Sequence, residues 1–262
     1  MFKSNPDFMR MAPTPERVLA VCRLVAQKPI SEKDLRDAMT LLNEEVETAP
    51  ISESVSVALS ELDLIKNVNG LLTLAVNENV ITSPTAFRRY VSSKVFSKKD
   101  TTFYMFTRWL ISQNEGIFKL RTWEVMAKTC ASEQADLSTL NENAVLGWRF
   151  WAAFLGLGYL SGTMIIPNMK LRLEDVIKTD FESKFKYGET IRATDFVAWL
   201  SSKLPEVDMT GKLPLALSGA LRTLHELHTI ELATWQDGEK IMLYYVDGEF
   251  INDFTHITVK EA

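Results

Sequence analysis

The sequence predicts a mainly helical α+β protein built from three small modules of similar plan. Three observations predict it. Apolar residues recur at helical spacing (i, i+3, i+4, i+7) along most of the chain. Short apolar runs joined by glycine-containing turns interrupt these helical stretches. The same order of elements recurs at unequal spacings, which excludes a regular solenoid and favours separate small domains.

The first module is the clearest. Thr14 is expected to cap a first helix, and a short strand follows at 28–30. Ser31, with an acidic residue three positions later, is expected to start a second helix. A third helix is expected from about Ser52. It is followed by two short apolar runs around Asn69-Gly70, a dipeptide that suits a tight hairpin turn because both residues tolerate positive φ.

The inner faces of two of these helices follow from the spacing of apolar residues. Leu35 and Leu42 are expected to point inward from the second helix. Val55, Leu59 and Leu62 are expected to do so from the third. Each helix then buries one apolar stripe against the other elements of the module.

The second and third modules repeat the plan. The second is expected to have a helix over 101–113, a strand over 116–119, a helix opened by Thr122, a helix over 141–157 and a hairpin turning at Ser161-Gly162. The third is expected to have a helix over 173–185, a strand over 189–192, helices over 193–203 and 214–227, and a hairpin over 230–246 turning at Asp237-Gly238.

Helix, strand, helix, helix, hairpin is the order of a winged helix, and residues Thr14 to Ala75 carry this resemblance. The resemblance implies tandem winged-helix domains. A helix over Pro84–Phe96 fits none of the modules and is interpreted as a connector. The expected boundaries are 1–82 for the first domain, 83–100 for a basic connecting helix, 101–172 for the second domain and 173–262 for the third.

Charge is unevenly distributed along the chain. The net charge is −5, yet residues 83–128 hold nine basic and three acidic residues. Such a stretch can neutralise phosphates without reading sequence, and Tyr90 and Phe96 in it could stack on bases. A solvated helix, or one that docks on the protein's own acidic ends, is the alternative. The candidate DNA-binding residues are Arg88, Arg89, Lys94, Lys98, Lys99, Arg108, Lys119 and Arg121.

The third helices are poorly suited to reading base edges. The first contains no Lys or Arg but has Glu53, and the third has only Arg222 with two histidines. The second is apolar on nearly every side, so it is buried either by another chain or by this one. Its candidate partner-binding residues are Trp148, Arg149, Phe150 and Phe154.

No catalytic motif emerges from the sequence. It has no Gly-rich phosphate loop and no GxSxG element, and His225 and His228 lack a third metal ligand nearby. Cys22 and Cys130 are expected to be buried thiols. We therefore expect a non-enzyme with no metal or cofactor. With no apolar run long enough to span a bilayer and no signal peptide, a cytoplasmic location is expected, without membrane contact.

These observations favour an adaptor or scaffold that docks partner proteins and contacts DNA non-specifically. In length and three-domain plan the chain resembles winged-helix accessory proteins of bacterial DNA-modification and phage-defence islands of the deazaguanine-DNA type. That resemblance implies a subunit of a larger complex, beside a helicase, ATPase or nuclease, and assigns no particular residue. The alternatives are a sequence-specific DNA-binding regulator or replication initiator, a condensin-type accessory subunit, and an unrecognised hydrolase.

Overall fold

The computed structural model describes residues 1–40 and 47–261. It is about 51% helix and 14% strand, with small antiparallel sheets, so the expected mixture of helices and hairpins is confirmed at that level. Its residues form two compact units. Unit 1 contains Met1–Phe106 and Thr122–Leu155, and unit 2 contains Thr107–Arg121 and Gly156–Ala262. Leu42, expected on an inner helix face, lies outside the described residues.

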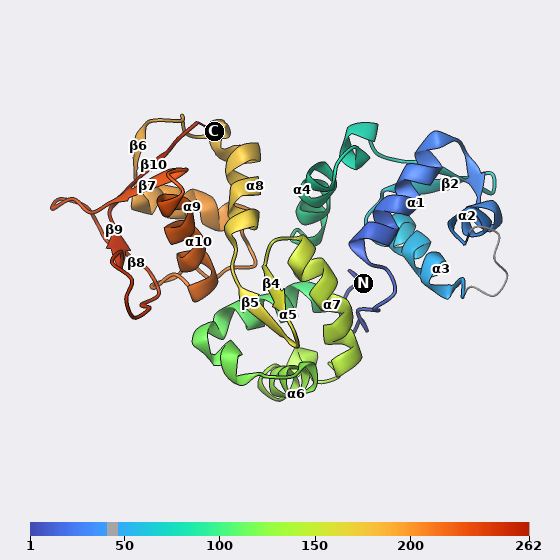
Figure 1. The fold of residues 1–262 in the computed structure, drawn as a ribbon, viewed down its shortest axis with the longest axis horizontal. Helices are drawn as coiled ribbons and strands as arrows, with labels where there is room; N and C mark the ends of the chain where they lie inside the picture. Colours follow the sequence, from blue (N-terminus) through green and yellow to red (C-terminus); the bar gives the residue numbers. More distant parts are fainter. Residues whose placement is uncertain (41–46, 262) are drawn as a thin grey trace. The chain divides into compact units, whose positions relative to one another are not determined.

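Unit 1 begins with the elements expected of the first module (Figure 1). In chain order they are α1 (Pro15–Gln27), β1 (Ile30–Ser31), α2 (Glu32–Met39), α3 (Ala49–Ser56), the π-helical turn η1 (Val57–Glu61), β2 (Ile65–Val68) and β3 (Leu71–Leu74). Thr14 and Ser31 cap α1 and α2, since their hydroxyls accept the backbone N–H groups of Arg17 and Asp34. The three strands form an antiparallel sheet in the order β1-β3-β2.

The expected hairpin turn is confirmed. Val68 pairs with Leu71, which leaves Asn69 and Gly70 as the two turn residues. Their φ angles are 52° and 85°. Both values lie in the left-handed region, where glycine and asparagine are the residues of lowest cost.

One inner-face expectation is wrong in part. Val55 and Leu62 are buried as expected, but Leu59 is half-exposed, and Val57 and Ala58 are buried beside it. The cause is the π-helical turn over Val57–Glu61. A π turn holds more residues than an α turn, so the residues within it rotate away from the face that a 3.6-residue period predicts.

The rest of unit 1 is helical. It contains the 3₁₀ turn η2 (Glu78–Ile81), α4 (Pro84–Val95), the first part of α5 (Thr102–Ser112), α6 (Trp123–Glu133), the 3₁₀ turn η4 (Ala135–Leu137) and α7 (Glu142–Phe154). Ser83, Thr122 and Asn141 cap α4, α6 and α7 with their side chains. The expected connector over Pro84–Phe96 is thus confirmed as a helix.

Residues 1–13, here called the N-terminal strap, are built into the core of unit 1. The Phe2 ring packs edge-on against Phe103 and Trp151, at centroid distances of 5.0 and 4.9 Å. The indole N–H of Trp151 donates to the carbonyl oxygen of Pro13 at 2.7 Å. A Cβ at Gly147 would lie 1.7 Å from the carbonyl oxygen of Met9, so only glycine allows the strap to cross α7 there.

Unit 2 begins with the end of α5 and is completed by the chain after Leu155. Its further elements are the 3₁₀ turn η3 (Asn114–Lys119), β4 (Gly158–Ser161), β5 (Met164–Pro167), α8 (Lys170–Asp180), the 3₁₀ turn η5 (Phe181–Ser183), β6 (Thr190–Arg192), α9 (Ala193–Lys203), α10 (Leu215–Glu226), β7 (Ile230–Ala233), β8 (Ile241–Met242), β9 (Asp253–Phe254) and β10 (His256–Val259). β6, β10 and β7 lie side by side in that order (Figure 1).

Two expected strand assignments in unit 2 are wrong. Residues 116–119 form part of a 3₁₀ turn rather than a strand. The β4–β5 hairpin therefore gains no third strand from this segment, and its two strands pair only with each other. β7 does not form a local hairpin over 230–246. It pairs with β10, and the chain between them makes an excursion that contains the small β8–β9 pair. The expected turn residues Asp237 and Gly238 lie inside this excursion.

The expected second domain, 101–172, is shared between the units. Helices α6 and α7 belong to unit 1, whereas the β4–β5 hairpin belongs to unit 2. The turn of that hairpin also differs by one residue from the expectation, since Ser161 pairs with Met164 and leaves Gly162 and Thr163 between them. Three winged-helix domains with the boundaries given above stay a prediction.

Candidate interaction surfaces

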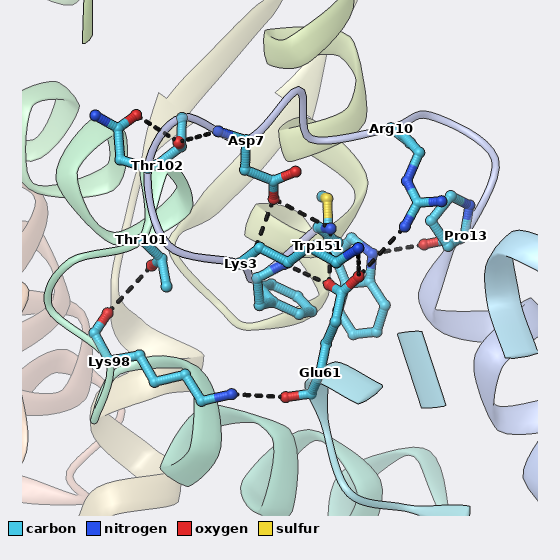
Figure 2. Close-up of polar contacts among 12 residues, drawn as sticks. Lys3, Asp7, Arg10, Pro13, Glu61, Lys98, Thr101, Thr102 and Trp151 are labelled. Atoms are coloured by element: carbon cyan, nitrogen blue, oxygen red, sulfur yellow. Dashed lines mark hydrogen bonds and ion pairs between the residues drawn. The ribbon is translucent and has the colours of Figure 1, made fainter. Parts of the chain in front are cut away.

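The basic connecting helix α4 makes many of its contacts with its own unit. Arg88 is buried and has an interaction partner within the protein. Lys94 forms an ion pair with Asp63 at 3.0 Å, and this hydrogen bond raises the pKa of Lys94. The ammonium of Lys98 donates to the carbonyl oxygen of Glu61 at 2.8 Å (Figure 2). Three of the predicted DNA-binding residues thus make contacts within their own unit. This is what a helix docked on its own protein would show, one of the alternatives that the sequence left open.

The remaining predicted DNA-binding residues are distributed over both units. Lys99 is exposed four residues after the end of α4, in unit 1, and Arg89, within α4, is half-buried with a partner of its own. Arg108 belongs to unit 2 and lies 3.7 Å from the carboxylate of Asp208. Lys119 and Arg121 are exposed in the same unit. Lys99, Lys119 and Arg121 are therefore the residues in the set with the most accessible charge.

The two aromatic residues of the basic segment do not form a free stacking platform. Phe96 is buried and packs against Phe103, so the expectation that it stacks on bases is wrong. Tyr90 is half-buried, and its hydroxyl donates to the carbonyl oxygen of Leu62 at 3.0 Å. Burial raises the pKa of this phenol. Both rings support the packing of α4.

The apolar helix α7 is covered largely by its own chain. Trp148 has no exposed surface, and its ring packs edge-on against Phe106 at 4.9 Å. The N-terminal strap covers α7 at Gly147 and Trp151. Burial within the chain, one of the two alternatives, therefore accounts for Trp148.

Three other candidate residues of α7 keep some accessible surface. Arg149, Phe150 and Phe154 are half-buried. The guanidinium of Arg149 lies 4.6 Å from the ring centre of Phe150 and 5.7 Å from that of Trp123. These three residues are what α7 can offer to a partner.

Exposed apolar side chains gather instead on hairpins and loops, which the sequence reading did not single out. On the β4–β5 hairpin, Tyr159 is 55% exposed, and Leu160 and Ile166 are also exposed. The excursion between β7 and β10 exposes a second group. Its members are Trp235, Met242, Tyr245 and Phe250. The sequence did contain a signal for this exposure, the run Met164-Ile165-Ile166. A strand with one solvated face normally alternates apolar and polar residues, so three successive apolar residues place at least one of them in solvent.

The two cysteines are buried, and His225 and His256 make contacts within the chain. Burial raises the pKa of both Cys22 and Cys130 to about 12, so neither thiol is an ionised nucleophile at neutral pH. His225 Nδ1 accepts the backbone N–H of Leu232 at 3.0 Å. The His256 ring stacks on Trp235 at a centroid distance of 3.8 Å.

Within residues 1–40 and 47–261, no group of three or more His, Cys, Asp or Glu is placed to hold a metal ion. In the same part of the chain, no helix is both long enough and apolar enough to cross a membrane. Comparisons of the chain with protein families, with curated proteins and with solved structures find no match.

Proposed function

We propose that this protein is a non-catalytic adaptor built from winged-helix modules, which docks partner proteins through its β-hairpins. The support for the winged-helix part is topological. In unit 1, α1, β1, α2, α3, β2 and β3 follow one another, and the sheet order is β1-β3-β2. In unit 2, α8, β6, α9, α10, β7 and β10 follow the same plan with the sheet order β6-β10-β7.

The single observation that carries the docking part is the exposure of large apolar side chains on the β4–β5 hairpin. Tyr159, Leu160 and Ile166 are all exposed there. Apolar groups grouped on a surface gain free energy when a partner removes them from water. Tyrosine is also enriched at protein interfaces, because it combines a large apolar ring with a polar end.

The helices that would read DNA in a winged helix support protein docking instead. The α3 helix contains no Lys or Arg. In α10 the single arginine, Arg222, is buried, and its guanidinium donates to the carbonyl oxygens of Ile251 and Tyr244 at 2.9 and 2.8 Å. Base-edge readout mostly uses Arg, Lys, Asn or Gln, and neither helix exposes such a side chain.

Non-specific DNA contact is a second part of the proposal, and it rests on Lys99, Lys119 and Arg121. Their exposed charges can approach phosphates. The resemblance to accessory proteins of DNA-modification and phage-defence islands suggests the setting, a bacterial cytoplasmic complex with a helicase, ATPase or nuclease. We expect the gene for this protein to lie beside genes for such enzymes and to be transcribed with them.

The docking proposal is tested by comparing two double variants in the native cell. Tyr159→Ser with Ile166→Ser removes the apolar hairpin surface, whereas Val125→Ser with Leu227→Ser removes exposed apolar side chains from two helix surfaces. Tagged proteins are purified with their partners, and the partners are quantified by mass spectrometry. We expect the hairpin variant to lose its partners and the control to keep them, with both unfolding at the wild-type temperature.

Two outcomes would contradict the proposal. One is a hairpin variant that retains its partners at wild-type levels. The other is turnover of nucleic acid by the purified protein that disappears when one carboxylate is changed to its amide, which would establish the hydrolase alternative.

A further inference from the structure

Unit 2 contains a cavity of about 420 Å³ beside the sheet β6-β10-β7. Its walls come from β6, from the first turn of α9, from the start of β10 and from the start of the excursion that follows β7. The side chains that matter for the inference are Arg192, Trp235, Asp237, Glu239, Thr255 and His256. The volume lies in the range of ligand-binding pockets, so the cavity is large enough to admit a side chain. We call this cavity the Trp235 pocket.

Trp235 is held in place by His256 and Thr255, yet it remains accessible to solvent. Its ring stacks on His256 at a centroid distance of 3.8 Å and an interplanar angle of 28°. Its backbone N–H donates to Thr255 Oγ1 at 2.8 Å, and the same hydroxyl lies 2.9 Å from His256 Nδ1. Even so, Trp235 is 53% exposed. The indole is therefore held by His256 through one face and keeps about half of its residue surface accessible.

The loop that carries Trp235 is also held close to the sheet. A Cβ at Gly238 would lie 2.4 Å from the Cβ of Thr255. Only glycine lets the loop pass at this distance. Trp235, Asp237 and Glu239 are thus positioned from one short segment whose path is fixed at Gly238.

The charge of the pocket is negative. Asp237 and Glu239 are both exposed, and neither makes an ion pair with any residue from 1–40 or 47–261. Arg192 is the one cationic side chain among the lining residues, so the carboxylates outnumber it two to one. Residues 235–253, which begin with the pocket loop, contain five carboxylates and one lysine; Lys240 is paired with Asp253 at 3.1 Å, and Glu249 lies 3.8 Å from the guanidinium of Arg222. An anionic ligand such as a nucleotide would meet this charge unfavourably.

We propose that the Trp235 pocket binds an arginine side chain of a partner protein. Tryptophan is the best aromatic partner for a cation, and a planar guanidinium stacks on its face. The edge of the guanidinium provides five N–H donors, which two carboxylates can accept. Lysine has a compact, strongly hydrated ammonium and gains less from a flat platform. This inference rests on the proposed docking function and specifies the chemistry of one partner contact.

The test uses the full chain and a short peptide of alternating arginine and glycine. Its control ligand is the same peptide with citrulline, which keeps the shape of arginine and removes its charge. Calorimetry is expected to show binding of the arginine peptide, weakened by salt, and no binding of the citrulline peptide. Trp235→Ala is expected to weaken binding roughly tenfold.

A charge-matched pair of variants separates the pocket from the general acidity of the unit. Asp237→Asn with Glu239→Gln is expected to weaken binding roughly tenfold and to flatten its salt dependence. Glu226→Gln with Asp195→Asn removes the same charge from α10 and α9, and is expected to bind like the wild type. Circular dichroism and the unfolding temperature confirm that each variant is folded.

Equal binding of the arginine and citrulline peptides would overturn the inference, as would wild-type affinity in Trp235→Ala. Binding of guanosine monophosphate without binding of the arginine peptide would overturn it too. If peptide binding fails while partner capture still depends on Tyr159 and Ile166, this pocket is refuted and the adaptor function stands. If the hairpin variants keep all partners, the adaptor function itself is refuted.

Discussion

The α-ammonium nitrogen of Met1 lies 2.7 Å from Oε2 of Glu61, and both side chains are buried. The same carboxylate accepts the backbone N–H of Phe2 at 2.6 Å and the guanidinium of Arg10 at 3.2 Å. Figure 2 shows Lys3, Asp7 and Arg10 gathered around it. Glu61, which lies in the π-helical turn η1, thus contacts the strap at its start, through Met1 and Phe2, and again at Arg10.

Replacing Glu61 is therefore expected to destabilise unit 1. Glu61→Gln removes the closest counter-charge of the buried Met1 ammonium and leaves only Asp7, at 3.1 Å, so the cost is expected to be at most about 3–5 kcal/mol, the range for a broken buried pair. Urea unfolding measures the loss. The control is Asp63→Asn, which breaks the exposed pair with Lys94 and is expected to cost about 1 kcal/mol or less. Equal losses in the two variants would contradict the role given to Glu61.

A single methyl group is expected to displace the strap. Gly147→Ala places a Cβ 1.7 Å from the carbonyl oxygen of Met9, so the strap must move. We expect a loss of about 1–3 kcal/mol, as for other overpacked sites, and faster trypsin cleavage after Lys3 and Arg10.

The matched control for that experiment is Gly219→Ala in α10, where an added Cβ meets nothing within 4 Å. Alanine is the better helix former, so this variant is expected to gain up to about 1 kcal/mol. A Gly147→Ala protein as stable as wild type, with an uncleaved strap, would show that the strap does not cross α7 as described.

The basic residues around α4 are expected to separate into two classes. Lys99→Ala should lower affinity for all DNA duplexes alike and reduce the salt dependence of binding, without loss of stability. Arg88→Ala and Lys98→Ala should lower the unfolding temperature instead, because they remove a buried side chain and a contact to Glu61.

Mobility shifts with random and selected duplexes at two salt concentrations provide the measurement. Wild-type binding in Lys99→Ala would remove this residue from the proposed DNA contact. Strong discrimination between duplexes would favour the sequence-specific regulator over the adaptor.

Stability is expected to fall in alkaline solution because of the two thiols. Burial raises the pKa of Cys22 and Cys130 from an ordinary 9.0 to about 12. The folded state therefore keeps protons that the unfolded state loses above pH 9. The contribution is complete below pH 9 and is lost between pH 9 and about 12, at about 1.4 kcal/mol per pH unit for each thiol.

Urea unfolding at pH 7, 9 and 10.5 tests this. Cys22→Ala should show a shallower decline above pH 9 than the wild type, whatever its stability at pH 7. In addition, a thiol reagent at pH 8 should modify neither cysteine in the folded protein and both in urea. Rapid labelling of the folded protein would show that the thiols are accessible.

Sequence reasoning succeeded where local chemistry decides the structure. The Thr14 cap, the Ser31 cap and the Asn69-Gly70 turn each depend on residues within four positions of one another. It failed where the partner is distant. The apolar run of β7 looks like half of a hairpin, but its partner is β10, and nothing local indicates that the Asp237-Gly238 turn belongs to an excursion.

The candidate surfaces were predictable only in part, for a related reason. A lysine or arginine in a sequence does not show whether its charge meets solvent or a carbonyl oxygen. Arg88, Lys98 and Arg222 are all held within the protein, and the last two donate hydrogen bonds to backbone carbonyl oxygens. Apolar periodicity identified α7 as buried, but not that residues 1–13 would cover it.

The strap also orders events during synthesis. Pro13 bonds to Trp151, 138 residues further along the chain, and Asn5 bonds to the carbonyl oxygen of Asp136. Residues 1–13 are therefore translated long before the residues that bind them. The contacts of Phe2 and Met9 with α7 can form only after α7 has been translated, so residues 1–13 reach their native packing late in the folding of unit 1.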